Sequence, residues 1–114
     1  HPKELTPEAR EACERLVDHG VPVENQSVLM RRLNSDARII RELNHECLKM
    51  RVRPYYLHQM DPVSGAAHFA VADAEALRLV STVTNALPGY LVPKLVRETA
   101  GAPSKTLLGT FGAT

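Results

Sequence analysis

The stretch Val52-Arg53-Pro54-Tyr55-Tyr56-Leu57-His58-Gln59 decides the fold, because its β-branched and aromatic residues are typical of a strand. On its amino-terminal side, residues 36–50 repeat apolar side chains at helical spacing behind Ser35, a candidate cap. On its carboxyl side, residues 74–87 show the same periodicity. Pro54 lacks an amide hydrogen, so the strand either begins there or has a neighbour that does not need that donor.

The same alternation of helix and strand continues outward from this central strand. The order predicts an α/β fold in which parallel strands alternate with helices and are joined by right-handed crossovers. A closed eight-unit barrel needs about 250 residues, so 114 residues predict a part of a (β/α) barrel. The other expected elements are a helix from Thr6-Pro7 to Gly20, a strand over 21–30, a strand over 90–96 and a loop over 99–114.

Composition and charge exclude several classes of protein. Hydrophobic residues make up 44% and charged residues 24% of the chain, as in an ordinary globular domain. A net charge of +1 argues against a nucleic-acid surface. The sequence has neither an apolar run of the ~20 residues that cross a bilayer nor a signal-peptide pattern, so a cytoplasmic protein is expected. Cys13 and Cys47 lie on apolar helix faces and are interpreted as buried free thiols, with a disulfide or metal pair as the alternative.

Lys105 is the first candidate for chemistry. In parallel α/β folds, functional groups gather at the carboxyl ends of the strands. The small-residue run Gly101-Ala102-Pro103-Ser104 would let the amine of Lys105 reach back over those ends. A lysine there can form a Schiff base with a carbonyl cofactor, and the backbone amides of the run could approach a phosphate. By composition alone, a solvated surface lysine is the alternative.

Further polar residues are expected at the strand ends. Asp61 and Glu98 could together bind a cationic substrate group, or each could cap the loop or helix that follows it. Gln26, in the group Asn25-Gln26-Ser27, could bind a purine edge or a carboxylate, or make a structural hydrogen bond. His58 and His68 flank Asp61, but their spacing fits no compact metal pattern, so we predict no metal site.

Several strings in this sequence resemble the C-terminal half of the lysine 2,3-aminomutase family, which are radical S-adenosylmethionine enzymes that also use pyridoxal phosphate (PLP). The likeness covers nearly the whole chain, and the residues 93–98 and 101–106 look most like the branch that carries out β-lysylation of elongation factor P. The other branch has a glycine-richer run before its PLP lysine. The matching strings are His1-Pro2-Lys3-Glu4, Asn25-Gln26-Ser27-Val28-Leu29, Arg51-Val52-Arg53-Pro54-Tyr55-Tyr56, Gly65-Ala66-Ala67-His68-Phe69 and Gly89-Tyr90-Leu91-Val92-Pro93.

The resemblance implies an isomerase that moves the α-amino group of L-lysine to the β-carbon. Carried over residue by residue, it makes Lys105, in a loop at about 99–108, the lysine that binds PLP. It makes Asp61 and Glu98 the carboxylates that bind the side-chain ammonium of lysine, although the catabolic enzymes have aspartate at the second position. Gln26 matches a residue that contacts S-adenosylmethionine, and position 58 is histidine where many relatives carry tyrosine.

The resemblance also implies parts that the chain does not supply. A 4Fe-4S cluster is expected, but the sequence has no CxxxCxxC motif, so the cluster and the first barrel strands are expected upstream of His1, and the chain alone is expected to be inactive. Its expected partners are this missing N-terminal half and, as a homo-oligomer, further copies of itself. Two alternatives remain open: an isolated half-barrel with a structural role, and an aminomutase for another amino acid such as glutamate, which Asp61 and Glu98 would repel.

Overall fold

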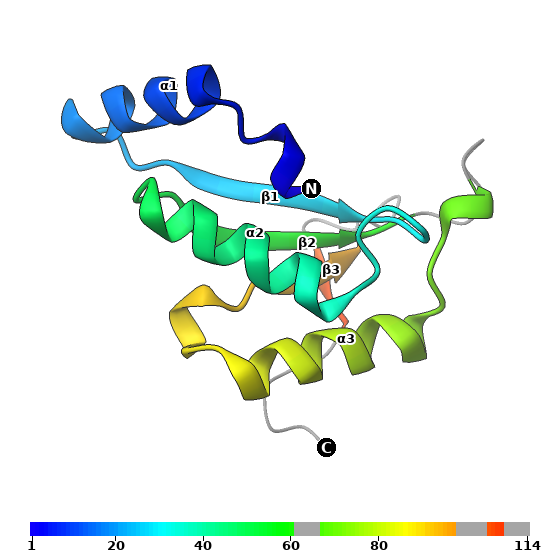
Figure 1. The fold of residues 1–114 in the computed structure, drawn as a ribbon. Coiled ribbons are helices and arrows are strands. Elements are labelled where there is room, and N and C mark those ends of the chain that lie inside the picture. Colours follow the sequence, from blue (N-terminus) through cyan, green and yellow to red (C-terminus); the bar gives the residue numbers. More distant parts are fainter. Residues whose placement is uncertain (61–66, 98–104, 109–114) are drawn as a thin grey trace.

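The computed structural model describes residues 1–60, 67–97 and 105–108 (Figure 1). The sheet has the order β1 (Glu24–Leu29), β2 (Arg53–Gln59), β3 (Lys94–Arg97) and β4 (Thr106–Leu107). The first three strands are parallel, and β4 is antiparallel to β3. This arrangement confirms the predicted α/β fold with parallel strands alternating with helices. The elements are η1 (Pro2–Glu4), α1 (Pro7–Asp18), β1 (Glu24–Leu29), α2 (Ala37–Lys49), β2 (Arg53–Gln59), η2 (Ala67–Phe69), α3 (Asp73–Ala86), η3 (Gly89–Leu91), β3 (Lys94–Arg97) and β4 (Thr106–Leu107).

The helices begin where local chemistry satisfies their first amides. Thr6 Oγ1 accepts a hydrogen bond from the Ala9 amide at 3.2 Å, so the predicted start of α1 is confirmed. At α2 the cap is Asp36 and not Ser35 as expected: Asp36 Oδ1 accepts from the Arg38 amide at 2.8 Å. A carboxylate there also interacts favourably with the positive end of the helix dipole.

The strand boundaries differ from the prediction at two places. β1 begins at Glu24 and not at residue 21. The expected strand over 90–96 begins only at Lys94, because Gly89–Leu91 forms a 3-10 turn that places Leu91 in the core. Local composition did not reveal this, since a buried apolar run reads the same in a turn as in a strand.

The tail contains a short strand where only a loop was expected. Thr106 pairs with Arg97, and Leu107 pairs with Val96, in an antiparallel ladder. The rest of the expected loop, residues 99–104 and 109–114, lies outside the described residues. β4 therefore returns Lys105, the residue before it, to the sheet.

Pro54 is accommodated by an irregularity in the sheet. It pairs with Asn25, and the register between β1 and β2 shifts directly after this pair, so that Gln26 lies opposite Tyr56. A register shift is a common way to place a residue that cannot donate to the ladder. Pro54 is the second residue of β2, which begins one residue earlier than the first predicted arrangement, at Arg53.

The core lies between one face of the sheet and the two helices α2 and α3 (Figure 1). Leu29, Leu57 and Leu95 come from β1, β2 and β3 and pack against Ile40 of α2 and residues of α3. A second cluster around Cys47 joins α2 to α1. Within the described residues, no helix is long and apolar enough to cross a membrane.

The two cysteines differ in their surroundings. Both are free thiols; Cys47 is buried as predicted, whereas Cys13 is only partly buried. Burial, with a smaller contribution from the nearby Cys13, raises the pKa of Cys47 to about 11. The Cys47 thiol therefore stays protonated at neutral pH.

Candidate active site

The sheet has a second face that α2 and α3 do not cover, and we call it the open face. Side chains alternate along a strand: in β1, Leu29 is 0% exposed on the helix side, whereas its neighbour Val28 is 40% exposed. By the same alternation Gln26 of β1 lies on the open face with Val28. His58 of β2 is opposite Val28 in the register, and Tyr56 is opposite Gln26.

A hydrogen bond joins two side chains across this face. His58 Nε2 and Gln26 Oε1 are 2.9 Å apart. Because an amide oxygen only accepts, His58 donates this hydrogen bond. The Nε2 hydrogens of Gln26 then remain as the donors that its amide can offer to a bound group.

Tyr56 links this pair to Lys105. The rings of Tyr56 and His58 are 5.7 Å apart between centroids in an edge-on arrangement. On its other side, Lys105 Nζ lies 5.4 Å from the centroid of the Tyr56 ring, within the range of a cation–π contact. Lys105 is half-buried. The structure thus brings Lys105, Tyr56, His58 and Gln26 to one face of the sheet.

A second tyrosine–lysine contact lies beside the first. Tyr55 and Tyr56 have ring centroids 4.2 Å apart, and Lys94 Nζ lies 5.5 Å from the Tyr55 ring. A hydrogen bond with the Tyr56 side chain raises the pKa of Tyr55. Each of the two neighbouring tyrosines thus has a lysine side chain over its ring, Lys94 at Tyr55 and Lys105 at Tyr56.

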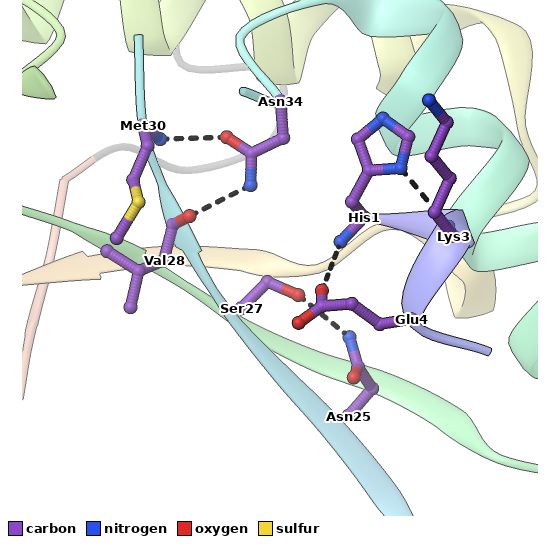
Figure 2. A network of polar contacts seen from close by, with 8 residues as sticks. All are labelled: His1, Lys3, Glu4, Asn25, Ser27, Val28, Met30 and Asn34. Carbon is purple, nitrogen blue, oxygen red and sulfur yellow. Dashed lines mark hydrogen bonds and ion pairs between the residues drawn. The ribbon is translucent and has the colours of Figure 1, made fainter. Parts of the chain in front are cut away.

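The placement of Asn25-Gln26-Ser27 corrects one expectation. These residues lie inside β1 and not at its carboxyl end. Asn25 and Ser27 are on the helix side, where Asn25 Nδ2 donates to Ser27 Oγ at 3.0 Å (Figure 2). The end of β1 is held instead by Asn34, whose Oδ1 accepts from the Met30 amide at 2.7 Å and whose Nδ2 donates to the Val28 carbonyl at 2.9 Å (Figure 2).

The carboxyl ends of β2 and β3 carry a network that the sequence analysis missed. Gln59, 5% exposed, donates from Nε2 to the Val71 carbonyl and to Asp73 Oδ1. Arg97 Nη2 donates to the same Asp73 oxygen. These hydrogen bonds, from Arg97 first and Gln59 second, lower the pKa of Asp73. An aspartate in the first turn of a helix reads from sequence as a dipole partner only, so no local signal identified Asp73.

A hollow of about 400 Å³ adjoins this network. Among the described residues it is lined by the end of β2, by residues 70–72, by Asp73 and by Arg97. It lies at the edge of the sheet where parallel α/β folds place their ligands.

The two predicted substrate carboxylates, Asp61 and Glu98, lie outside the described residues, so their convergence stays a prediction. His68 is exposed, and its ring lies 4.1 Å from that of Phe69. In the part of the chain that the structure describes, no group of three or more His, Cys, Asp or Glu side chains could hold a metal ion.

The sequence of this chain is similar to segments of known enzymes. No protein-family model matches the chain. The L-lysine 2,3-aminomutase of Haemophilus influenzae is 43% identical to it over 107 residues, and that of Escherichia coli is 44% identical over 108 residues. The chain is homologous to a segment of the L-lysine 2,3-aminomutases. The matches cover 94% and 95% of the chain but 32% of each relative.

A relative with another substrate in its name is also similar. The glutamate 2,3-aminomutase of Clostridioides difficile is 38% identical over 108 residues, which cover 95% of the chain and 26% of that relative. The chain therefore spans about a third or less of the curated aminomutases named here. The chain is therefore similar to segments of both a lysine and a glutamate 2,3-aminomutase.

Proposed function

We propose that this protein is an isomerase that moves the α-amino group of L-lysine to the β-carbon, and that residues 1–114 supply its PLP-binding and substrate-selecting side. One observation carries the proposal: in a chain homologous to lysine 2,3-aminomutases, Lys105 lies half-buried against Tyr56 on the open face. Gln26 and His58 are on the same face. Ligand sites are lined by aromatic side chains together with a few polar groups, and these residues offer both outside the hydrophobic core.

The residues present fit PLP at Lys105. When bound, PLP supplies the conjugated ring that lets an amino group migrate between adjacent carbons through a radical. Pairing of β4 with β3 fixes the backbone next to Lys105. Tyr56 contacts the lysine side chain and offers an aromatic surface. A lysine nitrogen bonds to a carbonyl carbon through its free lone pair.

Selection of lysine falls to Asp61 and Glu98 in this proposal. Two carboxylates around one ammonium group bind it strongly and reject an analogue that lacks the charge, since the carboxylates would then be left unpaired. An acidic substrate such as glutamate would be repelled. Because one similar protein is a glutamate 2,3-aminomutase, L-glutamate is the alternative substrate that a measurement must exclude.

Gln26 is the residue that we propose to contact S-adenosylmethionine. With Oε1 engaged by His58, its amide offers hydrogen-bond donors to the open face. A purine nitrogen or a carboxylate of the cofactor is a fitting acceptor.

The chain does not fit the 4Fe-4S cluster. It has two cysteines, one of them buried and protonated, and the CxxxCxxC motif is absent from the sequence. We therefore assign the cluster, and with it the source of the radical, to another part of the protein. β1 lies at the edge of the described sheet, where further strands of a barrel would pair.

The biological role that we propose is β-lysylation of elongation factor P. Its support is the sequence at the end of the chain, where Gly101-Ala102-Pro103-Ser104 precedes Lys105 in place of a glycine-richer run. In that role the β-lysine product would be attached to the factor. The competing role is catabolism of lysine.

The test is turnover by the full-length protein as encoded, supplied with PLP, S-adenosylmethionine and a reconstituted cluster. We expect conversion of L-lysine to β-lysine, faster than any conversion of L-glutamate, and complete loss of conversion in Lys105→Ala. No rearrangement of lysine together with no effect of Lys105→Ala would refute the proposal. Faster turnover of glutamate would transfer it to the other substrate.

A further inference from the structure

The turn that follows β1 carries two consecutive arginines at the carboxyl edge of the sheet. Residues 30–33 form this turn, in which the Leu33 amide donates to the Met30 carbonyl over 3.3 Å. Arg31 and Arg32 are its two central residues, and both are exposed. Parallel α/β folds bind their ligands at this edge, so the two arginines lie where a charged ligand group could meet them.

The backbone of the turn is held by hydrogen bonds on both sides. Asn34 Oδ1 accepts from the Met30 amide at 2.7 Å, and Asn34 Nδ2 donates to the Val28 carbonyl at 2.9 Å (Figure 2). The Arg31 amide donates to the Phe69 carbonyl at 2.7 Å, which joins the turn to η2. The two exposed side chains therefore start from fixed backbone positions.

Arg32 has a backbone conformation that is unfavourable for arginine. Its φ angle is 68°, in the left-handed region that favours glycine. A residue with a Cβ atom adopts this region at a cost in free energy that glycine avoids. Strained backbone is concentrated at ligand sites, so the conformation draws attention to the side chain of Arg32.

The charges of these two guanidinium groups are not balanced within the part of the chain that the structure describes. Neither group makes a hydrogen bond or an ion pair with a described residue. The nearest acidic residue in the sequence, Asp36, binds Arg38 instead, through the amide at 2.8 Å and the guanidinium at 3.4 Å. Adjacent positive charges attract an anion, and guanidinium groups bind carboxylate and phosphate through paired hydrogen bonds.

We propose that the turn at residues 30–33 binds an oxyanion of the reacting molecules, with Arg31 and Arg32 as the donors. This inference rests on the proposed function, in which three molecules carry such a group. They are L-lysine and S-adenosylmethionine, each with a carboxylate, and PLP with its phosphate. Position favours S-adenosylmethionine, because the turn directly follows β1, the strand that contains Gln26.

The test compares each molecule with an analogue that lacks its oxyanion. The pairs are L-lysine with L-lysinamide, PLP with pyridoxal, and S-adenosylmethionine with its decarboxylated form. Dissociation constants are measured by titration calorimetry on the full-length protein with a reconstituted cluster, and PLP is already bound when lysine or S-adenosylmethionine is titrated. In Arg31→Gln and in Arg32→Gln we expect the same one of the three molecules to bind about tenfold more weakly, with its analogue unchanged.

Arg53→Gln is the matched control for the removed charge. Arg53 is exposed and is the first residue of β2, at the opposite edge of the sheet from the turn. Its loss lowers the net charge of the protein by the same amount, so it reproduces any general electrostatic effect. We expect all three pairs to bind Arg53→Gln as they bind the unaltered protein.

Arg32→Gly separates a loss of binding from a loss of structure. Glycine adopts a φ of 68° without strain, so this variant should unfold at no lower urea concentration than the unaltered protein. It should still show the same tenfold loss of binding as Arg32→Gln. A loss of binding together with a lower urea midpoint would assign Arg32 to the fold and contradict the oxyanion site.

The remaining outcomes separate this inference from the proposed function. Unchanged binding of all three molecules in Arg31→Gln and Arg32→Gln refutes the oxyanion site alone, as does an equal loss in Arg53→Gln. An unaltered protein that binds none of the three molecules refutes the proposed function, and the oxyanion site with it.

Discussion

The two faces of the sheet carry different kinds of side chain although they are built from the same strands. The helix side of β1 and β2 buries Leu29 and Leu57 against α2 and α3. The open face of the same strands presents Gln26, Tyr56 and His58, which make polar and ring contacts with one another and with Lys105. Packing in the core explains why the strands carry leucines on the helix side, but it does not explain the polar and aromatic side chains on the open face. The difference teaches where to look for function: on the face that the core leaves unused.

The largest expected effect separates two neighbouring residues of β1. Leu29 is fully buried on the helix side, so we expect Leu29→Ala to lower the free energy of unfolding by about 2–5 kcal/mol. Val28 is 40% exposed on the open face, and Val28→Ala should cost under about 1 kcal/mol. Urea denaturation of both variants measures the difference. Equal losses would show that the two faces are equally packed.

The free energy of unfolding should depend on alkaline pH through one buried group on the helix side, the thiol of Cys47. Burial raises the pKa of Cys47 from about 9 to about 11, so the folded state retains a proton that the unfolded state releases. Its contribution to stability is complete below about pH 9 and is lost as the pH rises through about 11. The free energy of unfolding should therefore decline between pH 8 and pH 10.5, and the variant Cys47→Ala should lack the part of this decline that comes from ionisation of the thiol. An unchanged decline would contradict the burial of this thiol.

The smallest expected effect on stability lies on the open face. The hydrogen bond between His58 and Gln26 is exposed, so His58→Ala and Gln26→Ala should each change the free energy of unfolding by about 0.5 kcal/mol or less. Urea denaturation measures this as well. A loss comparable to that of Leu29→Ala would mean that this pair serves the fold rather than a ligand.

The element order could be predicted from the sequence because its signals are local. Helical periodicity and a cap identified α1, and β-branched and aromatic composition identified β2. β4 was missed because a strand of two residues exists only through its pairing with β3, which is distant in sequence. The start of β3 was misplaced because Leu91 is buried by a turn and not by a strand.

The candidate site divides in the same way. A lysine after a run of small residues could be singled out from sequence, but its contact with Tyr56 depends on the pairing of β4. Asp73 was missed because its partners are 14 and 24 residues away along the chain. Gln26 was expected at a strand end and lies inside β1, since the extent of a strand is set by its neighbours.

The central claim is that Lys105, on the open face, is the lysine that binds PLP. Its most direct test is reduction with borohydride after incubation of the full-length protein with PLP, followed by peptide mass spectrometry. The matched control is Lys94, which contacts the ring of Tyr55 at a similar distance, 5.5 Å against 5.4 Å. We predict that the reduced adduct lies on Lys105 and is lost in Lys105→Ala but kept in Lys94→Ala. An adduct on Lys94, or one that survives Lys105→Ala undiminished, would contradict the account.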